Sequence, residues 1–337
     1  MVVLNCYGKI EPICISEKLK LIISNPPEEK NNEWQSELSE ELKLVETVSN
    51  LFRKRVGIEP EQSVLKLYTK VFPDKPQPVS VDGKMIKELA ENMICIYFDY
   101  DYGDMPLGGW DTNCFDGRLC EEDCAEKVID FINFLSYRGD VPARFPKPTP
   151  QWVYSSNHDD IDHFRFLWGG EKADEYIQSL KKWGELFDNL LIDKNDYLLL
   201  DYLLNSIHKD NEYNEYHLMK SFSLCQLFLE KENESELDRK LPSFIAESDS
   251  NRRELSAQFF RRLRNKIAHG DFVAFENIIE EYAESIMDGC YAFDYSEYSR
   301  KNWVLLHVCC QLDDIVRQLI YLLLYNREKL EQIKKGA

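Results

Sequence analysis

The sequence predicts an α+β N-terminal domain over residues 1–165, followed by an all-α helical bundle over residues 166–337. The chain of 337 residues exceeds the size at which a single hydrophobic core usually stops growing. Short runs of Val, Ile and Leu, interrupted by prolines, dominate the first half. From about Glu171 onward prolines become rare and apolar residues recur at helical spacing. Gly169-Gly170 is a natural hinge between the halves, and Pro142–Pro150 is nearly as good.

The N-terminal half contains signals for both strands and helices. Within residues 1–30, three short strands are predicted in VVLNCYG, KIEPICI and LKLIIS. A helix is predicted over residues 38–56, because apolar residues recur there at positions 42, 45, 48, 51 and 52. Ile94–Tyr100 is predicted to be a strand, and Glu126–Tyr137 a short helix.

The C-terminal half is predicted to be helical throughout. Helices are expected near 171–191, 194–208, 212–231, 251–269, 273–288 and 298–330. The most apolar stretch, Trp303–Tyr325, contains Gln311, Asp313, Asp314 and Arg317. These polar residues favour a packed helix over a membrane span. The sequence therefore predicts a helical bundle and no membrane segment.

Composition limits the classes of function. The formal net charge of −19 argues against a broad basic surface for nucleic acid, so any such contact must be local. The ten cysteines and the absence of an export signal predict a cytoplasmic protein with reduced cysteines. The sequence has no Gly-rich phosphate loop, G-x-S-x-G, H-E-x-x-H or kinase signature, which removes common enzyme classes.

Two clusters could hold a metal, and both signals are weak. Cys114, Cys120 and Cys124, together with His158 or His163, could form a zinc site, but the spacing lacks a paired C-x2-C. The run from His158 to His163 is rich in Asp, and a solvated acidic loop is the favoured interpretation. We expect no metal and no cofactor.

The segment with the strongest chemical signal is NRRELSAQFFRRLRNKIAHG, residues 251–270. At about 100° per residue, one apolar stripe is predicted to contain Leu255, Phe259, Leu263 and Ile267. Polar side chains fall on the other side, namely Arg261, Arg264, Asn265 and His269. Asn265 and His269 are four residues apart and can touch, and Gly270 fits a left-handed cap that ends the helix.

This segment is basic in an acidic protein. Six basic residues and one acidic residue lie between Asn251 and Gly270, a local charge of +5. Arginine binds phosphate oxygens through its planar guanidinium, and a histidine beside it can exchange protons near neutral pH. Metal-free RNA cleavage needs both groups. A 2′-hydroxyl must lose a proton and a 5′-oxygen must gain one, which a histidine can do, and the phosphate charge must be stabilised, which an arginine can do.

The string RNKIAHG resembles the R-x4-6-H motif of HEPN domains, with four residues between Arg264 and His269. Asn265, directly after the arginine, also fits this motif. An earlier predicted helix, Glu215–Glu232, is similar to the first helix of ApeA-like HEPN proteins. The resemblance covers roughly Asp201–Tyr325 and implies an all-α HEPN-like bundle. HEPN domains occur in bacterial toxins, anti-phage abortive-infection proteins and CRISPR-associated ribonucleases.

The resemblance implies a metal-independent endoribonuclease, with tRNA as one possible substrate, that works as a homodimer through the motif helix. Arg264 would hold the phosphate, His269 would be general acid or base, and Asn265 would orient one of them. Further RNA contacts are expected from Arg261, Arg262 and Lys266. Arg264 and His269 are about 140° apart around one helix, so two facing helices are needed to focus both on one phosphate.

The setting implied by the resemblance is anti-phage defence or a toxin. Residues 1–165 would be a sensor or regulatory domain, whose acidic character suits a protein partner. Two other interpretations remain open. The bundle could bind RNA or nucleotide, or serve dimerisation, without cutting. Alternatively, Arg264 could pair with a carboxylate and His269 could cap the end of a helix.

Overall fold

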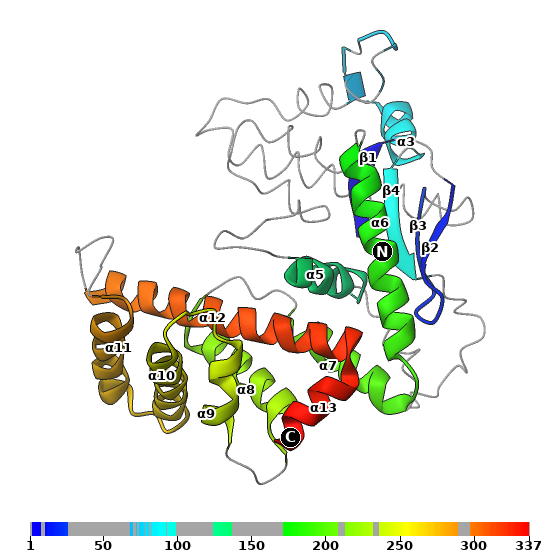
Figure 1. Cartoon of the computed structure of the whole chain (residues 1–337). Helices are drawn as coiled ribbons and strands as arrows, with labels where there is room; N and C mark the ends of the chain where they lie inside the picture. Colours follow the sequence, from blue (N-terminus) through cyan, green and yellow to red (C-terminus); the bar gives the residue numbers. More distant parts are fainter. Residues whose placement is uncertain are drawn as a thin grey trace, which may run out of the picture. The chain divides into compact units, whose positions relative to one another are not determined.

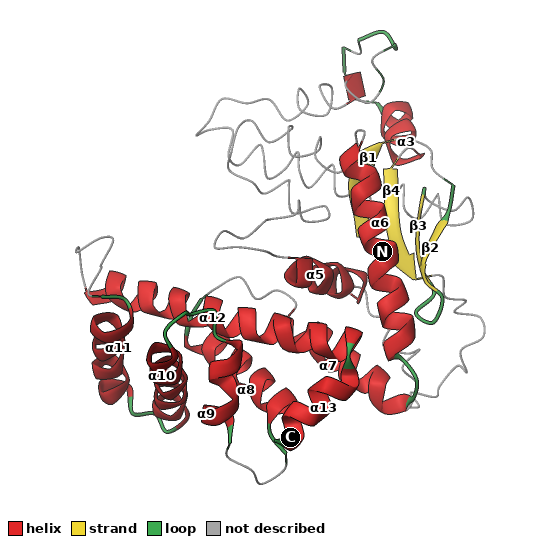
Figure 2. Ribbon diagram, in the orientation of Figure 1, coloured by secondary structure: helices red, strands yellow, loops and turns green. Residues whose placement is uncertain are grey.

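The computed structural model describes most of the C-terminal half and parts of the N-terminal half. The described residues are 2–7, 11–25, 68–69, 72, 74–77, 79–80, 82–91, 93–98, 124–136, 171–207, 213–231, 236–288 and 297–336. They are mostly helical, with one small sheet (Figure 2). The chain divides into two compact units, the first formed by Met1–Asn133 and Ala143–Leu204, the second by Phe134–Pro142 and Asn205–Ala337.

The sheet of the first unit has four strands in the order β1-β4-β3-β2. The strands are β1 (Val2–Tyr7), β2 (Ile13–Ser16), β3 (Leu21–Ser24) and β4 (Met93–Phe98), and each neighbouring pair is antiparallel (Figure 1). Leu21 and Ile23 of β3 are fully buried, whereas Ile22 between them is half-buried, as alternation along a strand requires. The three strands predicted within residues 1–30 are confirmed, and so is the strand predicted over Ile94–Tyr100, which is β4.

Helices accompany this sheet in the first unit. They are α3 (Gly83–Glu91), α5 (Cys124–Ser136), α6 (Glu171–Leu190) and α7 (Lys194–Ile207). Helix α3 was not predicted from the sequence. The last turn of α5 and the end of α7 fall in the second unit. The helix predicted over residues 38–56 lies outside the described residues.

Helix α6 packs closely on β2. This contact explains why α6 belongs to the first unit together with the N-terminal strands. A Cβ atom at Gly184 would lie 1.7 Å from the carbonyl oxygen of Ile15, so only glycine permits this approach. One turn later, the Asp188 carboxylate accepts hydrogen bonds from Ser16 Oγ at 2.5 Å and from the Glu17 amide at 2.9 Å. A side chain on α6 therefore fixes the turn that follows β2.

The second unit is helical, as predicted for the C-terminal part. Its elements after α7 are α8 (Glu215–Leu229), α9 (Leu237–Lys240), the 3-10 helix η4 (Leu241–Phe244), α10 (Ser250–Ala268), α11 (Phe272–Ile286), α12 (Glu297–Tyr325) and α13 (Arg327–Lys335). The long helix α12 packs against α8, α11 and α13, and α10 packs against α8 and α11 (Figure 1).

Two details of the helical part differ from the sequence prediction. The short α9 and η4 were not expected. The helix predicted over 298–330 ends at Tyr325, and a separate helix begins after Asn326. The reason is local, because the Asn326 side chain accepts a hydrogen bond from the Lys329 amide at 3.1 Å and so caps a new helix.

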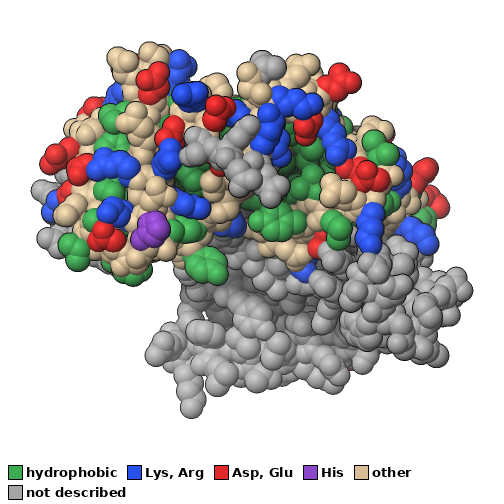
Figure 3. Space-filling view, turned by 90° about the horizontal axis from the view of Figure 1, so that it is seen from below, with side chains coloured by type: hydrophobic (Ala, Val, Ile, Leu, Met, Phe, Trp, Pro, Cys, Tyr) green, Lys and Arg blue, Asp and Glu red, His purple; other side chains and the backbone are tan. Residues whose placement is uncertain are grey.

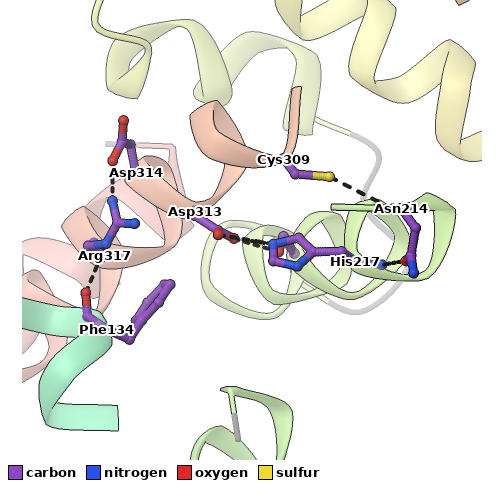
Figure 4. Close-up of polar contacts among 8 residues, drawn as sticks. Phe134, Asn214, His217, Cys309, Asp313, Asp314 and Arg317 are labelled. Atoms are coloured by element: carbon purple, nitrogen blue, oxygen red, sulfur yellow. Dashed lines mark hydrogen bonds and ion pairs between the residues drawn. The ribbon is translucent and has the colours of Figure 1, made fainter. Parts of the chain in front are cut away.

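A polar cluster is buried between α8 and α12. His217 Nε2 lies 2.8 and 3.0 Å from the two carboxylate oxygens of Asp313 (Figure 4). Ser221 Oγ donates to the same carboxylate at 2.9 Å. All three side chains are buried. On the next residues of α12, Arg317 pairs with Asp314 and donates to the carbonyl of Phe134 at 2.9 Å (Figure 4). The cluster fixes the rotation of α8 against α12.

A first prediction concerns the contact of α6 with β2. We expect Gly184→Ala to destabilise the protein by about 3 kcal/mol, because the added methyl group meets the backbone rather than a movable side chain. The free energy of unfolding is measured with urea. Gly83→Ala is the matched control, because nothing lies within 4 Å of its added Cβ atom. Equal stabilities of the two variants would contradict the packing described above.

A second prediction concerns the buried cluster. His217→Leu leaves the Asp313 carboxylate buried without its histidine, so we expect a loss of about 3 kcal/mol in the free energy of unfolding. The double variant His217→Leu with Asp313→Leu should recover much of this loss, because it buries no charge. The control Asp314→Asn alters an exposed residue and should cost less than about 1 kcal/mol. A double variant no more stable than His217→Leu would argue against a buried charge.

Candidate functional site

The candidate site lies at the C-terminal end of α10. This helix begins with Asp249, whose side chain accepts a hydrogen bond from the Asn251 amide at 2.8 Å. It ends with Gly270 in the left-handed conformation, at φ 69°. The Gly270 amide donates to Ile267 and the Asp271 amide to Lys266, both at 3.0 Å. This pair of bonds satisfies carbonyls that the helix end leaves open, and the predicted glycine cap is confirmed.

The buried face of α10 is rotated slightly from the predicted stripe. Phe260 and Leu263 are fully buried and Phe259 nearly so, whereas Leu255 and Ile267 are only half-buried. The ring of Phe259 meets Tyr282 of α11 edge-on, with 5.3 Å between centroids. The difference arises because α10 packs on both α8 and α11, which requires a wider apolar face than one stripe supplies.

Arg264 lies at the edge of this buried face. Its Nη1 donates to Asn265 Oδ1 at 3.1 Å, and its guanidinium carbon lies 5.8 Å from the ring centroid of Phe222 on α8. Its Nε is buried and has no hydrogen-bond partner among the described residues. Leaving a buried donor unsatisfied costs about 1–3 kcal/mol, so this arginine is held in an unfavourable state.

The other basic side chains of α10 are paired with neighbouring elements. Arg261 lies 2.5 Å from Asp238 of α9, and Arg262 lies 2.6 Å from Glu281 of α11. The remaining contacts follow the same pattern: Lys266 with Asp271 at 2.7 Å, Arg252 with Asp288 at 3.0 Å, and Arg253 with the Glu247 carbonyl at 3.3 Å. Of the six basic residues of α10, Arg264 alone contacts neither a carboxylate nor a main-chain carbonyl of the described residues.

These ion pairs correct the expected electrostatics of the segment. The sequence places a charge of +5 on residues 251–270, but carboxylates from α9, from α11 and from the turns offset most of it. Figure 3 shows Lys and Arg side chains interspersed with Asp and Glu on the face that it displays. The Lys266 ammonium, with the Ala274 amide, also holds the pKa of Asp271 below its usual value. The site is locally balanced rather than strongly basic.

His269 is the last residue before the glycine cap. Its amide donates to the Asn265 carbonyl at 3.1 Å, and its side chain is exposed. Arg264 and His269 differ by about 140° around a regular helix, whereas Asn265 and His269 differ by about 40°. Among the described residues, no hydrogen bond joins the His269 side chain to either of them. The structure therefore brings Arg264 and Asn265 together and leaves His269 facing solvent.

Several residues around the site were not found from the sequence. Phe222, Asp238 and Glu281 each contact an arginine of α10 from another helix. No local pattern marks them, because their role depends on how helices distant in the sequence pack. The one available signal was weak: Asp238 stands among charged residues, as many surface carboxylates do.

The described residues contain no group of three or more His, Cys, Asp or Glu that could hold a metal ion. Of the residues considered for zinc, Cys114, Cys120, His158 and His163 lie outside the described part, and the side chain of Cys124 is not described. None of the helices in the described ranges is long and apolar enough to cross a membrane. No protein-family model, curated protein or solved structure matches the chain.

Proposed function

We propose that this protein is a metal-independent endoribonuclease of the HEPN type, with its active site at the C-terminal end of α10. The observation that carries the proposal is the state of Arg264. It lies five residues before an exposed histidine, it has no carboxylate partner among the described residues, and its Nε is buried without a hydrogen bond. Arginine binds phosphate through its planar guanidinium, and no carboxylate among the described residues competes for this one.

Each site residue then has a defined role. Arg264 binds the scissile phosphate and stabilises the charge that develops on it. His269 takes the proton of the 2′-hydroxyl or donates one to the leaving 5′-oxygen. Asn265, which already accepts a hydrogen bond from Arg264 at 3.1 Å, orients the guanidinium. The products are a 2′,3′-cyclic phosphate and a 5′-hydroxyl.

The site is completed by a second copy of the chain. One helix directs Arg264 and His269 about 140° apart, so a single protomer does not place both on one phosphate. Two α10 ends facing each other across a two-fold axis place the arginine of one protomer near the histidine of its partner. This arrangement agrees with the exposure of His269.

Arg261, Arg262 and Lys266 are the secondary RNA contacts in this proposal. Because each is paired with a carboxylate, RNA phosphates must exchange with Asp238, Glu281 and Asp271. RNA binding is then weaker, and less dependent on salt, than six free cations would give. We place the protein in the cytoplasm in a defence or toxin role, with residues 1–165 as the regulatory part that binds a protein trigger.

The balanced charge of α10 favours one alternative, a HEPN-like module that binds RNA or forms dimers without cutting. A site that relies on few unpaired cations can serve protein contact as readily as catalysis. The experiment below distinguishes the two.

The test compares the parent protein with Arg264→Ala and His269→Ala, each incubated with total RNA or tRNA in the presence of EDTA. We expect the parent to cleave under chelation and each variant to lose activity by roughly 100-fold or more. The measurement is the rate of appearance of 2′,3′-cyclic phosphate ends.

Arg253→Ala is the matched control, because it removes an arginine of the same helix that binds a main-chain carbonyl. Its activity should stay near that of the parent. Cleavage that stops with EDTA, or that persists in both site variants, would sink the proposal. Binding of RNA without cleavage would favour the non-catalytic alternative.

A further inference from the structure

Two arginines of α10 lie over buried aromatic rings, and they differ in what else they contact. The guanidinium carbon of Arg262 lies 5.1 Å from the ring centroid of Phe259, and its Nη2 lies 2.6 Å from a carboxylate oxygen of Glu281. The guanidinium carbon of Arg264 lies 5.8 Å from the ring centroid of Phe222. Both distances fall within the range of a cation–π contact, about 6 Å. At Arg264 the ring is present, and the described residues supply no carboxylate.

This difference decides which donors of the guanidinium stay available. A carboxylate occupies N–H groups of a guanidinium, whereas an aromatic ring attracts the cation through its face and leaves those groups for other acceptors. One Nη1 donor of Arg264 goes to Asn265 Oδ1 at 3.1 Å, and the buried Nε has no partner among the described residues. The guanidinium is therefore held in place while it keeps donors for phosphate oxygens.

Phe222 itself is fixed on α8. Its side chain is 2% exposed. The preceding residue, Ser221, donates a hydrogen bond to the Asp313 carboxylate at 2.9 Å, and His217 Nε2, one turn earlier, lies 2.8 Å from the same carboxylate. These bonds tie α8 to α12 directly beside the ring, so the ring keeps a constant position next to Arg264.

We infer that Phe222 is a positioning residue, which orders the Arg264 side chain for phosphate without neutralising it. An arginine that is already ordered loses less conformational entropy when its ligand binds. A carboxylate in place of the ring would order the side chain too, but it would compete with phosphate for the same N–H groups. This inference rests on the proposed function, in which Arg264 binds the scissile phosphate, and it adds to the site a residue of α8.

The test measures the dissociation constant of inorganic phosphate for the full chain by isothermal titration calorimetry at constant ionic strength. Arg264→Ala should abolish the binding. Phe222→Leu keeps an apolar side chain but removes the ring, so we expect the dissociation constant to rise roughly 3- to 10-fold, as for the ordering of one long side chain. In the RNA cleavage assay, Phe222→Leu should lower kcat by at least this factor and change KM less, because Arg264 acts mainly on charge that develops in the transition state.

The matched control is Phe228→Leu, which removes a ring from the same helix. Phe228 is 4% exposed, and no Lys or Arg of the described residues lies over its ring. Both Leu variants should lower the unfolding midpoint by a similar amount, because each removes a buried ring, but Phe228→Leu should bind phosphate like the parent. A second variant, Phe222→pentafluorophenylalanine, keeps a ring of nearly the same shape and reverses the charge on its face. It should weaken phosphate binding while the unfolding midpoint stays close to that of the parent.

Phosphate binding that is unchanged in either Phe222 variant, or that Phe228→Leu weakens equally, would overturn the inference. A parent that binds no phosphate would overturn it as well. A parent that binds phosphate through Arg264 and Phe222 but never cleaves RNA would overturn the proposed ribonuclease and leave the positioning role standing.

Discussion

A carboxylate buried between two helices sets the geometry of the C-terminal part. Asp313 on α12 accepts hydrogen bonds from His217 and Ser221 of α8, and all three side chains are removed from solvent. Burying a charge is costly unless hydrogen bonds compensate it, so this cluster favours the rotation of α8 against α12 that keeps these bonds. The residue after Ser221 is Phe222, whose ring lies beside the Arg264 guanidinium. The polar cluster and the candidate site are thus connected through adjacent residues of one helix.

The charges around α10 decide what the candidate site can do. A cationic helix that faced only solvent would bind phosphate at many points. Here carboxylates on α9 and α11 pair with Arg261 and Arg262. Under the proposed function, the attraction for RNA is therefore concentrated on Arg264, and the site would contact one phosphate rather than a long stretch of RNA backbone. Such a limited contact is compatible with the net charge of −19.

The sequence predicted local features well and distant contacts poorly, for physical reasons. Helix periodicity, the N-terminal strands and the Gly270 cap depend on neighbouring residues, and the structure has them. The end of α12 at Tyr325 was missed because a single capping side chain, Asn326, outweighs a continuing apolar pattern. The +5 charge of the α10 segment could not be corrected in advance, since Asp238 and Glu281 reach it only through packing. The HEPN resemblance rests on the motif string and remains a prediction.

In the proposed mechanism, Arg264 of one protomer and His269 of its partner act together on one phosphate. The most direct measurement uses a mixed dimer, in which Arg264→Ala and His269→Ala chains with different affinity tags are produced together and purified through both tags. Each variant alone should be inactive, whereas the mixed dimer keeps one intact arginine and one intact histidine and should recover up to about half of the parent activity. A mixed dimer as inactive as the single variants, alongside an active parent, would contradict a site shared between protomers.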